Sequence, residues 1–77
     1  MGMMMMMSET LWTIRGWRFV THPDLHNTVE LIGPDKIGHE MWAEDGFLIH
    51  NLMFYYVPKD VRARAIRTAC KLLGAEY

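Results

Sequence analysis

The sequence has little of what small proteins use as covalent or metal reinforcement. It contains one cysteine, Cys70, in 77 residues, which excludes an internal disulfide and a cysteine-based zinc site. Its six glycines are scattered and form neither a phosphate-binding loop nor a nucleophile elbow. We therefore expect a protein that is not an enzyme and has no cofactor. The core of so short a chain leaves a small stability margin, which favours a partner or a second copy.

Apolar runs long enough to cross a bilayer are also missing. The longest, over residues 47–57, is interrupted by His50 and Asn51, whereas a spanning helix needs about 20 apolar residues. Residues 1–7 hold six of the eight methionines but no basic residue and no cleavage site typical of a secretory signal. We expect a cytoplasmic protein without membrane contact, with a flexible methionine-rich tail over residues 1–9 and one domain over residues 10–77.

Excess charge of one sign is lacking overall, because the formal net charge is −1. The two parts of the chain differ, however. Residues 1–56 carry three basic and seven acidic side chains, and residues 57–77 carry five basic and two acidic side chains. A chain that mainly grips nucleic acid is usually basic overall. The charge balance therefore favours another kind of partner.

What the sequence does contain begins with a segment rich in β-formers, over residues 10–20. It reads as one strand with a β-bulge at Gly16. Strict alternation would separate Trp12 and Ile14 from Trp17 and Phe19, whereas the bulge would return all four to one face.

Three more strands are predicted, over residues 28–32, 37–44 and 47–56. Pro34 favours a turn between the first two, and the pair Asp45 and Gly46 predicts a type I′ hairpin between the last two. Residues 47–56 are apolar on both faces, so a buried helix is the alternative for that segment.

A C-terminal amphipathic helix is predicted from about Pro58 to Leu73. Pro58 is typical of a helix start, Asp60 suits the first turn, and Gly74 follows the last periodic residue. A spacing of 100° per residue predicts a buried face formed by Val61, Ala65, Ile66, Ala69, Leu72 and Leu73. Arg62 falls within this face, so its charged end must reach solvent or a partner.

These elements predict an α+β fold, a four-stranded antiparallel meander followed by one helix, ββββα. One helix covers one face of a sheet, so we expect the other face to be apolar and to bind something. We predict a non-catalytic protein–protein interaction module, a homodimeric regulator or inhibitor of the kind that phages and mobile elements encode. The expected anchors are aromatic: Trp12, Trp17, Trp42, Tyr55 and Tyr56.

Two alternatives remain open. The basic side chains of the helix, Arg62, Arg64, Arg67 and Lys71, form a separate electrostatic contact that could bind nucleic acid. His39 and His50 lie diagonally across the predicted hairpin and are candidate metal ligands, although no known ligand spacing is present.

Overall fold

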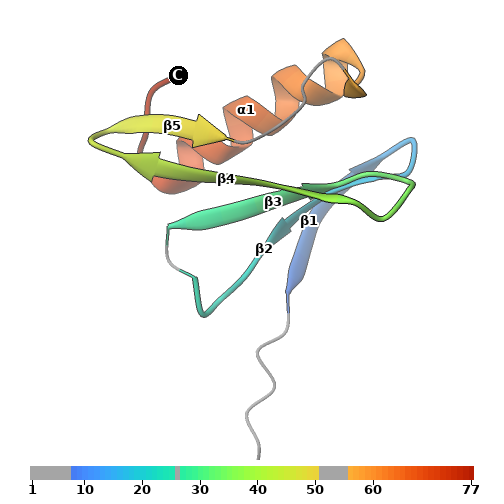
Figure 1. Ribbon diagram of the computed structural model, residues 1–77, viewed down its shortest axis with the longest axis horizontal. Coiled ribbons are helices and arrows are strands. Elements are labelled where there is room, and N and C mark those ends of the chain that lie inside the picture. The colour runs from blue at the N-terminus through green and yellow to red at the C-terminus, as the bar shows by residue number, and fades with distance from the viewer. Residues whose placement is uncertain (1–7, 26, 51–55) are drawn as a thin grey trace, which may run out of the picture.

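The computed structural model describes residues 8–25, 27–50 and 56–77. It shows an α+β arrangement of one antiparallel sheet and one C-terminal helix, with the strands in sequence order as a meander (Figure 1). The elements are β1 (Glu9–Ile14), β2 (Trp17–Thr21), β3 (Thr28–Ile32), β4 (Gly38–Glu44), β5 (Phe47–His50) and α1 (Lys59–Leu73). Most of the expected tail over residues 1–9 lies outside the described residues, and β1 already begins at Glu9.

The sheet has five strands rather than the predicted four, because residues 10–20 form a hairpin and not one strand. Arg15 and Gly16 occupy the two turn positions with φ of 48° and 85°, the left-handed geometry of a type I′ turn. The bulge predicted at Gly16 is therefore wrong. The irregularity in register lies instead between Thr10 and Trp12.

The hairpin nevertheless brings the large side chains of β1 and β2 to one face. Ile14 pairs with Trp17, and Trp12 pairs with Phe19. Residues directly opposite each other in an antiparallel pair share a face. The hairpin therefore places the large side chains of this segment on one face, which is the arrangement that the bulge was predicted to produce.

The predicted hairpin at Asp45 and Gly46 is confirmed, with φ of 54° and 84° and with Glu44 paired to Phe47. The strand over residues 28–32 also has the predicted bounds. The last strand is confirmed as far as His50. Residues 51–55 lie outside the described residues, and Tyr56 is not in a strand.

The helix is confirmed, with Pro58 as its N-cap and Gly74 in the left-handed conformation as its C-cap. Val61, Ala65 and Ala69 are fully buried. Leu72 was predicted to be buried as well but is 50% exposed; it lies in the last turn of α1, which ends at Leu73, and lines the groove on the outer side of the helix. Among the described residues, no helix has the length and apolarity to cross a membrane.

The core lies between α1 and one face of the sheet (Figure 1). Its fully buried side chains include Phe19, Leu31 and Met41, which the register places on the same face as Trp12 and Trp17. By the same register, the opposite face mixes polar and apolar side chains: Thr13, Arg18, Val20, Thr28, Glu30, Ile32, Glu40, Trp42, Glu44, Phe47 and Ile49. The second face is therefore not mainly apolar as expected, because the first hairpin directs Trp12, Trp17 and Phe19 toward the helix, whereas Trp42 lies on the opposite face.

The two outer strands of the sheet differ in what lies beside them. Glu76 makes a parallel bridge with Phe47 in β5, accepting from the Leu48 N–H at 2.7 Å and donating to the Gly46 carbonyl at 2.9 Å. On the other side of the sheet, β1 pairs with β2. Within residues 8–25, 27–50 and 56–77, no segment pairs with the outer edge of β1.

Candidate binding site

An open pocket of about 450 Å³ lies where the end of the sheet meets the start of α1. Its lining comes from four parts of the chain: Trp17 opens β2, Asp35 and Ile37 belong to the β3–β4 turn, His39 lies in β4, and Tyr56 precedes α1. Turns that connect alternate strand pairs of a meander fall at the same end of the sheet. Figure 1 shows the β1–β2 and β3–β4 turns together at the end nearest the start of α1.

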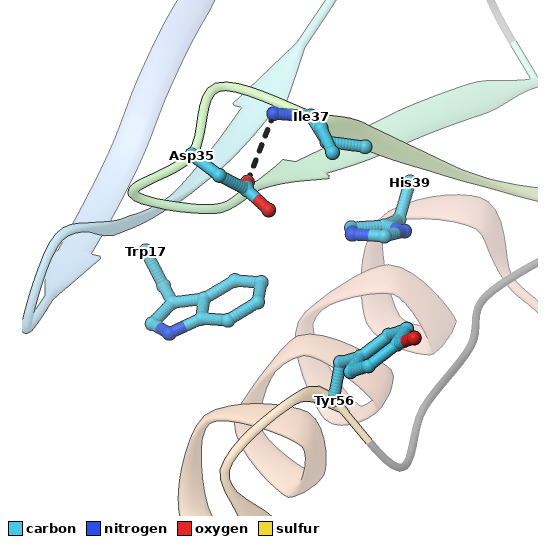
Figure 2. Close-up of a pocket in the computed structure, with 5 residues that line it drawn as sticks. All are labelled: Trp17, Asp35, Ile37, His39 and Tyr56. Carbon is cyan, nitrogen blue, oxygen red and sulfur yellow. Dashed lines mark hydrogen bonds between the residues drawn. The ribbon is translucent and has the colours of Figure 1, made fainter.

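Aromatic rings dominate the walls of this pocket. The Trp17 and His39 ring centroids are 6.2 Å apart with an angle of 30° between the planes, so these two rings form one continuous wall. Figure 2 shows the Tyr56 ring facing the same open space from the side of the helix. Tyr56 is 62% exposed and Ile37 is 57% exposed, which leaves apolar surface accessible to a ligand.

The β3–β4 turn fixes the positions of the Trp17 ring and of the Asp35 carboxylate. A Cβ at Gly33 would lie 2.9 Å from Cζ3 of Trp17, so the indole rests directly on the glycine backbone. The Ile37 N–H donates to Oδ1 of Asp35 at 3.0 Å (Figure 2), which is the side-chain-to-backbone bond typical of aspartate in turns. The Lys36 N–H donates to the Gly33 carbonyl at 2.8 Å and closes the turn.

Two further contacts hold the pocket end together. Arg15 donates to Oδ1 of Asp60 at 2.6 Å, which ties the β1–β2 turn to the first turn of the helix. This hydrogen bond lowers the pKa of Asp60 and raises that of Arg15. A Cβ at Gly16 would lie 3.2 Å from Cγ of Pro34, so the two turns touch. The pocket is therefore bounded by elements that are fixed to one another.

Of the five predicted anchors, the structure brings Trp17 and Tyr56 together in the pocket. Trp12 instead packs between the sheet and the helix, with its ring stacked on Phe19 at 5.4 Å. Trp42 lies on the opposite face of the sheet. Tyr55 is outside the described residues.

The four basic residues of the predicted electrostatic contact also do not all lie at one site. Arg64, Arg67 and Lys71 line a shallow groove of about 430 Å³ on the outer side of α1, together with Thr68 and Leu72. Arg62 is half-buried and is not part of that groove.

The two candidate metal ligands have aromatic neighbours. His39 belongs to the pocket wall, whereas the His50 ring stacks on Tyr77 at 5.9 Å and shares a 3.2 Å hydrogen bond with its hydroxyl. Partial burial lowers the pKa of His50. Among the side chains the structure describes, no three of His, Cys, Asp and Glu lie close enough to hold a metal ion.

Asp35 and Ile37 are the site residues that the sequence analysis missed. A turn that includes Asp35 was predicted from Pro34, but Ile37 was predicted to begin the next strand, which begins at Gly38 instead, and the neighbours of the turn were not predicted. Recognising Arg15 and Gly16 as a turn would have placed both turns at one end of the sheet, with Trp17 between them.

Comparison with protein-family models, curated proteins and solved structures finds no match for this chain.

Proposed function

We propose that this chain is a protein-binding module that receives a side chain of its partner in the pocket beside Trp17. The observation that carries the proposal is the open hollow walled by Trp17, His39 and Tyr56. Aromatic side chains are enriched among the residues that dominate binding energy at interfaces. The volume of about 450 Å³ is also within the range of sites that hold small groups.

The packing around Trp17 supports this proposal. Binding is weakened when side chains and loops must be ordered at the interface, and a preorganised side chain avoids that loss. Here the Trp17 indole rests on Gly33, and a hydrogen bond from Arg15 to Asp60 joins the adjacent turn to the helix. A partner would meet the Trp17 wall already in place. A regulatory or inhibitory role would follow from occupying the partner's surface.

The test is capture of a partner from a native lysate by the full chain and by two tyrosine variants. Tyr56→Ala removes one wall of the pocket. Tyr77→Ala is the matched control, because Tyr77 is similarly exposed, at 68% against 62%, but does not line the pocket. Circular dichroism establishes that both variants fold.

We expect Tyr56→Ala to lose at least tenfold in affinity for the captured protein, which is typical of an interface hot spot. Tyr77→Ala should retain it. Equal capture by the two variants, or a partner that binds both as well as the parent chain, contradicts a docking role for the pocket.

The groove on the outer side of α1 favours a second candidate function, contact with nucleic acid. Its basic residues are Arg64, Arg67 and Lys71, and none of the described residues that line it is acidic. Three phosphate contacts predict that log affinity falls with log salt with a slope of roughly −2 to −3. A gel shift at low salt that Arg67→Glu with Lys71→Glu abolishes would support this function, and the absence of any shift at low salt rejects it.

A further inference from the structure

The ligand chemistry of the pocket follows from its rings and its one carboxylate. The faces of Trp17 and Tyr56 carry the negative part of the aromatic quadrupole, which attracts cations, and tryptophan does so most strongly. Among the described residues that line the pocket, Asp35 is the one with a carboxylate, and none is Lys or Arg. An anion would meet repulsion from Asp35. A neutral apolar group would remove water from that carboxylate without replacing its interactions.

The shape of the pocket and the N–H donors of each candidate cation narrow the chemical class of the ligand further. An unmodified ammonium has three N–H donors that need acceptors, which the faces of the Trp17 and Tyr56 rings do not supply, whereas methyl groups need none. A planar guanidinium fits best between parallel faces. Here Trp17 and His39 stack on each other as one wall, and Tyr56 faces the same space from the side of the helix (Figure 2), so the rings lie on more than one side of the space. This arrangement suits a rounded cation whose surface is made of methyl groups.

We propose that the pocket binds a methylated lysine side chain of a partner protein, with its methylammonium group against Trp17 and Tyr56 and its charge balanced by Asp35. That the methylated lysine comes from a partner protein rests on the proposed function. The affinity of the pocket for a methylammonium ion is independent of that function and can be measured on the isolated chain.

The first experiment titrates the full chain with tetramethylammonium chloride and, separately, with neopentyl alcohol, a neutral molecule of similar shape. Binding is followed by NMR at pH 8, above the usual titration range of histidine side chains. The signals to observe are the three tryptophan indole N–H groups, assigned by single Trp→Phe variants. We expect tetramethylammonium to shift the Trp17 indole and to leave those of Trp12 and Trp42 unchanged. The neutral molecule should bind at least fivefold more weakly, because it lacks the cation–π attraction.

The matched variant for the charge is Asp35→Asn. An asparagine side chain retains an oxygen that accepts the Ile37 N–H and keeps the turn, so the fold and the rings remain in place. We expect this variant to bind tetramethylammonium at least threefold more weakly and to bind neopentyl alcohol at least as well as the parent chain, because a neutral amide loses less than a carboxylate when water is removed from it. Equal affinity for the cation and the neutral molecule, or no effect of Asp35→Asn on cation binding, overturns the proposal.

A second pair of probes assigns the natural group. Peptides that differ only in one lysine, unmodified or trimethylated, should differ at least fivefold in affinity in favour of the trimethylated form. Preference for the unmodified peptide overturns the choice of methylated lysine. The two proposals also fail separately. If the ions bind as expected but Tyr56→Ala does not affect partner capture, the protein-binding function is wrong. If capture requires Tyr56 but the ion and the alcohol bind equally, the cation inference is wrong.

Discussion

Replacing Trp12 with phenylalanine tests whether this ring belongs to the interior or to a binding surface. In the structure its Nε1 donates to Oγ1 of Thr68 at 3.1 Å, and the guanidinium of Arg64 lies 5.1 Å from its ring centroid. Trp12→Phe removes the donor and offers the cation a weaker ring face. The Thr68 hydroxyl keeps its own bond to the Arg64 carbonyl at 2.8 Å, so it is not left without a partner.

The expected loss of stability follows from these contacts. One neutral hydrogen bond contributes about 1 kcal/mol, and an exposed cation–π contact contributes about 0.5 kcal/mol or more. Together with the reduced contact of the smaller ring, the free energy of unfolding should fall by about 1–2 kcal/mol. For a domain of this size, that corresponds to a decrease in Tm of about 4–16 °C.

Trp42→Phe is the matched control, because the Nε1 of Trp42 has only a long contact of 3.4 Å to Glu44. Its free energy of unfolding should change by less than about 0.5 kcal/mol. Urea denaturation followed by far-ultraviolet circular dichroism measures both variants. Equal losses would refute the reasoning. A stable Trp12→Phe variant that fails to capture a partner would restore Trp12 as an anchor.

Gly16→Ala and Asp60→Asn test the end of the sheet that holds the pocket, with Gly46→Ala as the control for the first. Gly16→Ala and Gly46→Ala both place a side chain at φ near 85°, which costs about 1 kcal/mol, but only at Gly16 would the added Cβ meet Pro34. Gly16→Ala should therefore lower the free energy of unfolding by about 1 kcal/mol more than Gly46→Ala in the same urea assay. Equal losses in the two variants would exclude contact between the two turns. Because Arg15 lowers the pKa of Asp60 in the folded state, the bond between them stabilises the fold above the ordinary aspartate pKa and ceases to do so as pH falls through the lowered value. Asp60→Asn should accordingly be less stable than the parent chain at neutral pH and equal to it in acid, and a difference that persists in acid would point to another role for this residue.

The elements that the sequence predicted correctly are those that local chemistry determines. Asp45 and Gly46 adopt positive φ at low cost, and this property fixes both the hairpin and the pairing of Glu44 with Phe47. The helix ends where Gly74 takes a left-handed conformation. These signals act within a few residues, so they can be read without knowing the rest of the fold.

The errors arose where the outcome depends on distant contacts. Arg15 is an uncommon residue for a left-handed turn position, and the sequence around it is otherwise typical of one strand. In the structure that turn is supported by Asp60 and Pro34, which are far away along the chain. The pocket depends on the same arrangement. Trp17 and Tyr56 could be named as candidates from their type, but Asp35 and Ile37 join them only through the topology of the sheet.

The two outer edges of the sheet differ in how far they are covered, and this difference limits how copies of this chain could pair. Glu76 occupies part of the outer edge of β5, whereas none of the described residues covers the outer edge of β1. If two copies paired antiparallel through their β1 strands, each copy would use the outer edge of β1. The outer edge of β5 in each copy would remain partly covered by Glu76. Pairing through strand edges would therefore stop at two copies, because Glu76 covers part of the outer edge of each β5.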